Sequence, residues 1–109
     1  MEYLNKVQLR GRVGSARVNR FNNAGVCNFS LATEYQYTDR QGNQCLDMQW
    51  HNCSVWERSD LPSIDGITKG AIVELEGRIK TRKYTTPDGI DRTTTEIAVQ
   101  KFKILTDER

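Results

Sequence analysis

The sequence predicts an all-β protein in which short strands close into a small barrel, with projecting β-hairpins and at most one short helix. Apolar and polar residues alternate along several short segments, which is the pattern of half-buried strands. Turn signals separate these segments, and only one stretch has helix-like spacing. Closure is favoured because it removes the exposed edges that such strands would otherwise leave. An SH3-like barrel is an alternative on this basis.

The first two predicted strands lie near the N-terminus. One face of the strand predicted over 7–13 consists of Val7, Leu9, Gly11 and Val13. The other face consists of Gln8, Arg10 and Arg12, and Lys6 precedes them on the same side. A polar, basic stretch follows over 15–23. Gly25 then introduces a second strand, whose apolar face consists of Cys27, Phe29 and Leu31.

Two later segments have strongly contrasting faces. One face of 48–56 holds Met48, Trp50, Asn52, Ser54 and Trp56, and the other holds Gln49, His51, Cys53 and Val55. Over 72–84, we expect one face to be buried, consisting of Val73, Leu75, Gly77 and Ile79. The opposite face consists of Glu74, Glu76, Arg78, Lys80, Arg82 and Tyr84.

Turn and helix signals complete the predicted fold. Residues 39–43 and 87–89 predict the tips of two projecting hairpins. In the strand after the second tip, the residues expected to point inward are Thr93, Thr95, Ile97 and Val99. A further extended segment is expected around Phe102 and Ile104. Apolar residues recur at helical spacing at Leu61, Ile64 and Ile67. Because Pro62 and Gly66 interrupt this spacing, only a short or irregular helix is expected there.

The composition is that of an ordinary globular protein. Of 109 residues, 37% are hydrophobic and 28% are charged, so we expect a single domain over 1–109 with its own core. No signal peptide or membrane-spanning segment is recognisable, which predicts a cytoplasmic location. The formal net charge is only +2, so an anionic partner would have to be recognised by the local arrangement of charges.

The cysteines and the single histidine match no known site pattern. Cys27, Cys45 and Cys53 form an odd set without a C-x-x-C pair, which indicates free thiols. We expect Cys27 and Cys53 to be small core residues. His51 is close in sequence to two of them, but the spacing fits no usual zinc site, so no metal or other cofactor is predicted. Catalytic motifs are also missing, and the chain is predicted not to be an enzyme.

Large aromatic residues stand among cations on the predicted outward faces. Trp50 and Trp56 flank small polar residues, and Tyr84 ends a row of basic residues. An aromatic ring exposed on a strand leaves on the order of 150–250 Å² to be hydrated, which implies a partner. Unpaired bases stack on such rings at about 1–3 kcal/mol per base while cations neutralise the phosphates. Any one ring would serve a core or a subunit contact equally well, but the set favours single-stranded nucleic acid, with DNA and RNA not distinguished.

Several segments make the sequence resemble the bacterial single-stranded DNA-binding proteins. They are 5–14 (NKVQLRGRVG), 28–33 (NFSLAT), 50–52 (WHN) with 55–56 (VW), 69–84 and 88–96, and they occur in the family's order over nearly the whole chain. The resemblance implies a five-stranded OB-fold barrel and a homotetramer. It also implies sequence-independent binding and protection of single-stranded DNA during replication, recombination or repair, in association with the nucleoid.

The resemblance also suggests which residues form the site. The family's base-stacking positions align with Tyr37, Trp50, Trp56 and Tyr84, and Tyr35 lies only two residues from the first of them. Phosphate contacts are expected from Lys6, Arg10, Arg12, Arg78, Lys80 and Arg82. His51 matches a histidine that supports the subunit interface in the family, and Tyr3 and Leu4 are expected to pair there across a strand edge.

The end of the sequence differs from the family pattern. Family members usually continue into a flexible tail with an acidic, hydrophobic tip that recruits other proteins, whereas this sequence ends at 106–109 (TDER). Recruitment by such a tip is therefore not expected. The alternative function is that of an accessory OB-fold protein similar to primosomal replication protein N, which would act mainly through protein partners as a dimer.

Overall fold

The computed structural model describes residues 3–105, which form five strands and one short 3₁₀ helix. The elements are β1 (Val7–Phe21), β2 (Ala24–Thr38), β3 (Gln44–Trp56), η1 (Ile64–Gly66), β4 (Ile72–Thr85) and β5 (Asp91–Leu105). The strand order is β1-β2-β3-β5-β4, and β4 pairs back onto β1, so the sheet is a closed barrel. The predicted all-β barrel with at most one short helix is confirmed. No helix within residues 3–105 is long and apolar enough to cross a membrane.

β1 takes part in both halves of the barrel. Its first part, Val7–Arg12, pairs with β4, and the part from Arg12 onward pairs with β2. A register shift between Val13 and Ser15 bends the strand from one partner toward the other. All neighbouring strands are antiparallel except β3 and β5, which run parallel. The shared strand therefore joins the two outer faces on which the charged and aromatic residues lie.

The core is built from the inward faces of all five strands and from η1. Its buried residues are Val13, Cys27, Phe29, Leu31, Cys53, Val55, Ile64, Ile67, Val73, Leu75, Ile97, Val99 and Phe102. The prediction that Cys27 and Cys53 are core residues is confirmed, and all three cysteines are free thiols. Burial raises the pKa of Cys27, and burial followed by the nearby Glu96 carboxylate raises the pKa of Cys53 to about 12.

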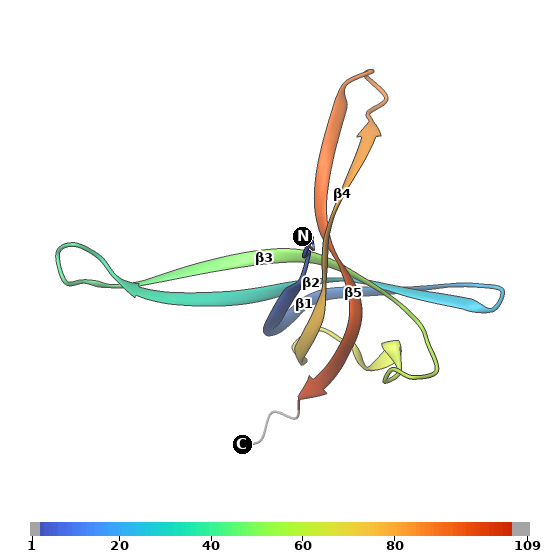
Figure 1. Cartoon of the computed structure of the whole chain (residues 1–109), viewed down its shortest axis with the longest axis horizontal. Coiled ribbons are helices and arrows are strands. Elements are labelled where there is room, and N and C mark those ends of the chain that lie inside the picture. The colour runs from blue at the N-terminus through green and yellow to red at the C-terminus, as the bar shows by residue number, and fades with distance from the viewer. Residues whose placement is uncertain (1–2, 106–109) are drawn as a thin grey trace.

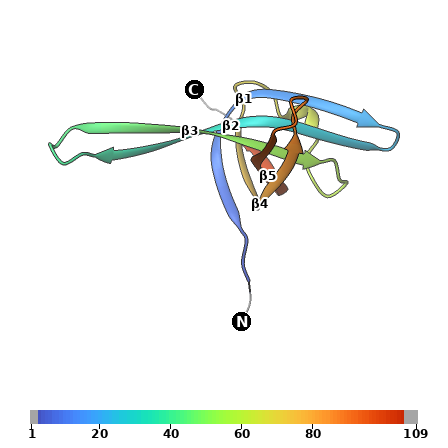
Figure 2. The same cartoon turned by 90° about the horizontal axis from the view of Figure 1, so that it is seen from above.

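Three hairpins project from the barrel (Figures 1 and 2). The β2–β3 and β4–β5 hairpins turn where the sequence predicts. The third hairpin joins β1 to β2, because the polar stretch after Gly14 continues β1 instead of leaving the sheet. Asn22 has a φ of 47° in its tight turn, a conformation that asparagine tolerates better than most residues.

The β4–β5 arm corrects part of the predicted core. Ile79 is 48% exposed, and Thr93 and Thr95 are also exposed, so their predicted burial is wrong. The pairing of β1 with β4 ends at Gly77, and β5 meets β3 only over 97–99. Beyond these points the side chain of Asn5 still hydrogen-bonds to the backbone of Ile79, but no further strand within residues 3–105 pairs with β4 or β5, so most of the arm is exposed. The alternating pattern continues past the barrel without a core to bury it.

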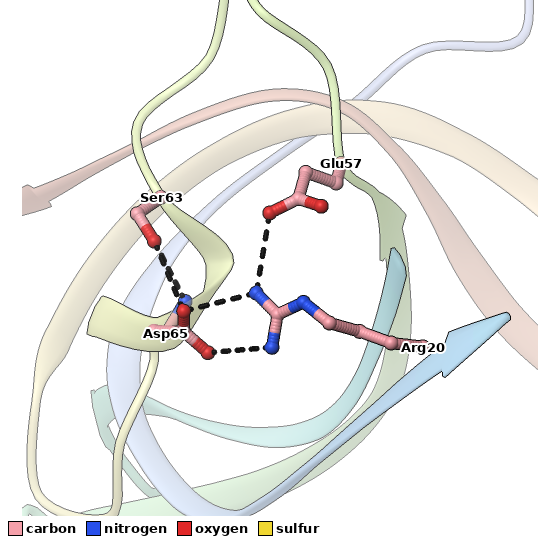
Figure 3. A network of polar contacts seen from close by, with 4 residues as sticks. All are labelled: Arg20, Glu57, Ser63 and Asp65. Carbon is pink, nitrogen blue, oxygen red and sulfur yellow. Dashed lines mark hydrogen bonds and ion pairs between the residues drawn. The ribbon is translucent and has the colours of Figure 1, made fainter. Parts of the chain in front are cut away.

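Arg20 ties the β1–β2 hairpin to η1 (Figure 3). Its guanidinium donates to both carboxylate oxygens of Asp65, at 3.2 and 2.9 Å, and to Glu57 at 3.2 Å. Ser63 caps η1 by accepting a hydrogen bond from the Asp65 backbone N–H at 3.2 Å. The hydrogen bonds from Arg20 hold the pKa of Asp65 below its ordinary value. This network fixes the segment that buries Ile64 against the barrel.

Candidate nucleic-acid interface

Two indoles stand on the outer face of β3. Trp50 is 59% exposed and Trp56 is 55% exposed, whereas the β3 residues of the opposite face, Cys53 and Val55, are buried. The predicted two-faced character of this strand is therefore confirmed. The two tryptophans are six residues apart, which is about 20 Å along an extended strand. The positions between them on the same face carry only small polar side chains.

Trp50 lies over the backbone of β1. A Cβ atom added at Gly14 would come within 2.4 Å of Cζ3 of the Trp50 ring, so a side chain at this position would displace the ring. Glycine thus leaves room for the indole beside the register shift of β1. The ring is supported from one side while more than half of the residue remains exposed. Such a ring can stack on a planar ligand without first leaving a packed site.

One row of outward residues crosses all five strands beside the tryptophans. Consecutive cross-strand partners in this row are Arg17, Asn28, Ser54, Ala98 and Arg78. The middle of the row is small or polar, and a guanidinium stands at each end. A groove of about 470 Å³ opens over this region, and its lining includes Arg17, Asn28, Asn52 and Glu96. The groove therefore has a polar lining and a cation at its rim.

The predicted phosphate-binding cations differ in whether a carboxylate already pairs with them. Glu76 of β4 lies between Lys6 of β1 and Lys101 of β5, at 3.6 Å from each. Partial burial acts to raise the pKa of Glu76, but the two lysines outweigh it and the pKa lies below its ordinary value. A second set repeats this arrangement and consists of Glu74, Arg10 at 3.2 Å and Lys103 at 3.7 Å. This outer face is a ladder of paired charges, so Lys6 and Arg10 are partly neutralised before any ligand arrives.

The remaining cations also divide into those that already have a partner and those that do not. Arg82 pairs with Glu96 at 2.8 Å, and Arg12 donates to the backbone oxygen of Gly70 at 2.7 Å. Within residues 3–105, the side chains of Arg78 and Lys80 make no ion pair or hydrogen bond. The same holds for Arg17, which the sequence analysis did not assign to the site. It was missed because the strand was expected to end before it, and only the pairing of 15–21 with β2 shows that the strand continues.

The predicted stacking tyrosines lie on the two arms. Tyr84 is 47% exposed on the β4–β5 arm, opposite Arg92. Tyr37 is 45% exposed on the β2–β3 arm, and its ring stacks on Tyr35 with centroids 6.2 Å apart. Tyr35 and Tyr37 thus form one aromatic surface. By register, this surface and Trp50 are on opposite faces of the β2–β3 ribbon, so a strand that contacts both would pass around its edge.

The residues expected at a subunit interface are accessible in the single chain. Tyr3 is 95% exposed and Leu4 is 86% exposed. His51 is half-buried, and its Nε2 atom lies 2.8 Å from the hydroxyl of Thr33. In the described part of the chain, no group of three or more His, Cys, Asp or Glu side chains gathers in a way that could hold a metal ion.

Comparison with known proteins assigns the family. Residues 4–105 match the single-strand binding protein family. The chain belongs to this family. Two single-stranded DNA-binding proteins from Neisseria meningitidis, one of serogroup A and one of serogroup B, are each 42% identical to it over 106 residues. These matches cover 94% of this chain and 60% of each relative, so the chain spans about 60% of the length of the curated relatives it matches.

Solved structures of single-strand binding proteins have the same barrel. A Plasmodium falciparum SSB in complex with ssDNA superimposes with a TM-score of 0.81 at 29% identity, covering 97% of this chain and 98% of that chain. A deletion mutant of the single-stranded DNA binding protein from Thermus aquaticus superimposes with a TM-score of 0.76 at 21% identity, covering 94% of this chain and 51% of that chain. The predicted OB-fold barrel is confirmed.

Proposed function

We propose that this member of the single-strand binding protein family binds and protects single-stranded DNA, stacking bases on Trp50 and Trp56 and neutralising phosphates with the free cations beside them. The observation that carries the proposal is the outer face of β3, where two indoles stay more than half exposed around small polar residues. Among common polyanions, single-stranded nucleic acids offer a flat unpaired base with every phosphate, and the relatives named for such binding are named for DNA. The bases and the backbone of single-stranded DNA therefore match the two kinds of side chain on this face.

The energetic terms favour a sequence-tolerant mode overall. Every base has a π-face, so stacking contributes about 1–3 kcal/mol per base whichever base is present. Cations at Arg17, Arg78 and Lys80 add a term that depends on phosphate charge alone. Two relatives that are 42% identical are named single-stranded DNA-binding proteins, and one structural neighbour was solved with ssDNA. A role in replication, recombination or repair, in the cytoplasm near the nucleoid, stays a prediction.

Titration with oligothymidine tests this proposal. Tryptophan fluorescence should be quenched as the oligomer stacks on the indoles, and affinity should fall as salt is raised because bound counterions are released with each phosphate contact. A duplex of the same sequence and length is the control, since its bases are already stacked and paired. Equal affinity for duplex and single strand would contradict the proposal.

We also propose that copies of the chain assemble through the N-terminal segment. Tyr3 and Leu4 leave two large side chains almost wholly in water, and His51 is the predicted interface residue on β3. Assembly would cover the apolar surface. Mass measurement in solution tests the state: a tetramer agrees with the expectation from the family, a dimer favours an accessory protein similar to primosomal replication protein N, and a monomer contradicts assembly.

A further inference from the structure

One exposed aromatic residue lies outside the site described above. Phe21 is the last residue of β1, at the tip of the β1–β2 hairpin, and it is 56% exposed. It is the one aromatic residue in the otherwise polar, basic stretch over 15–23. Its cross-strand partner, Ala24, is too small to cover the ring. Phe21 therefore leaves a large apolar surface in water, as the two tryptophans do.

The register of the sheet places Phe21 on the same outer face as Trp56. Trp56 pairs with Val26 of β2, and Val26 pairs with Asn19 of β1. Phe21 is two residues beyond Asn19 and therefore points to the same side of the sheet. Two strand spacings and two residues separate the Cα atoms of Phe21 and Trp56, which amounts to about 12 Å. Val26, on the strand between them, is only 7% exposed, so the surface between the two rings is packed.

The polar groove beside Trp56 extends toward Phe21. Its lining on β1 includes Arg17 and reaches Asn19, which is two residues before the phenyl ring. The side chain of Arg17 makes no ion pair or hydrogen bond in the described part of the chain and is available to attract a phosphate. A bound strand that follows Arg17 and Asn19 out of the groove thus reaches Phe21 next.

An ion pair next to the two rings fixes their spacing (Figure 3). Arg20 precedes Phe21 and Glu57 follows Trp56, and the guanidinium of Arg20 donates to the carboxylate of Glu57 at 3.2 Å. Asp65 of η1 accepts from the same guanidinium. Because side chains alternate along a strand, Arg20 points away from the face that carries Phe21. The hairpin tip is therefore held in place from behind, so less conformational freedom is lost when a base binds to its ring.

We propose that Phe21 is a further base-stacking residue, and that the bound strand continues from Trp56 across the β1–β2 hairpin to this ring. The inference rests on the proposed binding of single-stranded DNA and lengthens the bound segment by the nucleotides that reach Phe21. Every base can stack on a phenyl ring, so this contact adds no base preference. The sequence analysis did not assign Phe21 to the site because the strand was expected to end before it.

Titration with oligothymidine measures the contribution of this ring. Phe21→Ala should weaken binding at least about fivefold, which is the low end of the effect of one stacked base. The salt dependence should not change, because no cation is removed. Phe21→Leu keeps an apolar side chain without a π-face and should weaken binding to a similar extent, whereas Phe21→Trp should retain the affinity. Asn23→Ala is the matched control, because it alters the same hairpin tip without removing a ring, and it should leave the affinity unchanged.

A chain with a single tryptophan reports the contact directly. The sequence has only two tryptophans, so Phe21→Trp in a chain with Trp50→Phe and Trp56→Phe carries the only indole. Saturating oligothymidine should quench its fluorescence. The inference would be overturned by full affinity in F21A or F21L, by an equal loss in N23A, by a loss in F21A that a changed solution mass explains, or by an unquenched indole at position 21. If the wild-type chain binds oligothymidine no better than duplex, the proposed function itself fails.

Discussion

The division of the cations into free and paired groups predicts different effects on the salt dependence of binding. The test compares two double variants, Arg78→Ala with Lys80→Ala and Lys6→Ala with Arg10→Ala. Arg78 and Lys80 make no ion pair within residues 3–105, whereas Lys6 lies 3.6 Å from Glu76 and Arg10 lies 3.2 Å from Glu74. Both variants lower the net charge by the same amount, so only the environment of the removed charges differs.

The magnitude follows from counterion release. On a single strand, each phosphate contact contributes about 0.7 to the slope of log K against log salt concentration. Removing Arg78 and Lys80 should therefore lower the slope by about 1.4. Removing Lys6 and Arg10 should lower it by less than about half that amount, because each shares a carboxylate with another cation. Fluorescence titration with oligothymidine at four or more salt concentrations measures both slopes, and solution mass confirms that the assemblies compared are the same. Equal slopes for the two variants, or a larger loss for the paired set, would refute the assignment of phosphate contacts to the free cations.

Further variants and reagents test the stacking site, the Arg20 network and the thiols. Trp50→Ala should weaken oligothymidine binding by about 1–3 kcal/mol, which is roughly five- to 150-fold, without unfolding the chain, and an unchanged affinity would remove this ring from the site. The hydrogen bonds from Arg20 hold the pKa of Asp65 in the folded chain below its ordinary value of 3.8. The stability that this ion pair supplies is therefore present above pH 3.8 and is lost as pH falls through the lower pKa of the folded state. Arg20→Ala should thus lower the urea midpoint at neutral pH and flatten its fall on acidification, and a parallel shift at all pH values would contradict this. A thiol reagent should modify the half-buried Cys45 in the native chain but not Cys53, whose pKa of about 12 and burial keep it protonated and covered; modification of both at one rate would count against the native packing.

The alternating pattern of single strands was enough to predict the barrel and its aromatic face. In β3, Asn52 and Ser54 stand between the two tryptophans and are poor core neighbours, whereas Cys53 and Val55 on the other face suit a core, so local sequence favours the exposure of both tryptophans. The same reasoning fails for Ile79, because alternation shows which residues share a face and cannot show where the barrel ends and an arm begins. Pairing between distant strands supplies that information.

The pairing of charges also depends on contacts between distant strands, so it could not be predicted from the sequence. Glu76 and Lys101 are 25 positions apart, and only the β4–β5 register places them opposite each other. The sequence therefore assigned Lys6 and Arg10 to phosphates although each already has a carboxylate beside it. Arg17 was missed because nothing in 15–23 alone distinguishes a strand from a polar loop. These differences concern which cations are free, and the four aromatic residues predicted to stack on bases are all exposed.

The central claim is that exposed indoles hold the unpaired bases of a bound strand. The most direct measurement compares tryptophan quenching by oligothymidine with quenching by an abasic oligomer that has the same number of phosphates. The account predicts strong quenching and tight binding for the first, and weak, salt-sensitive binding with little quenching for the second. Equal binding and equal quenching by the two oligomers would show that the chain recognises only a polyanion and would contradict the claim.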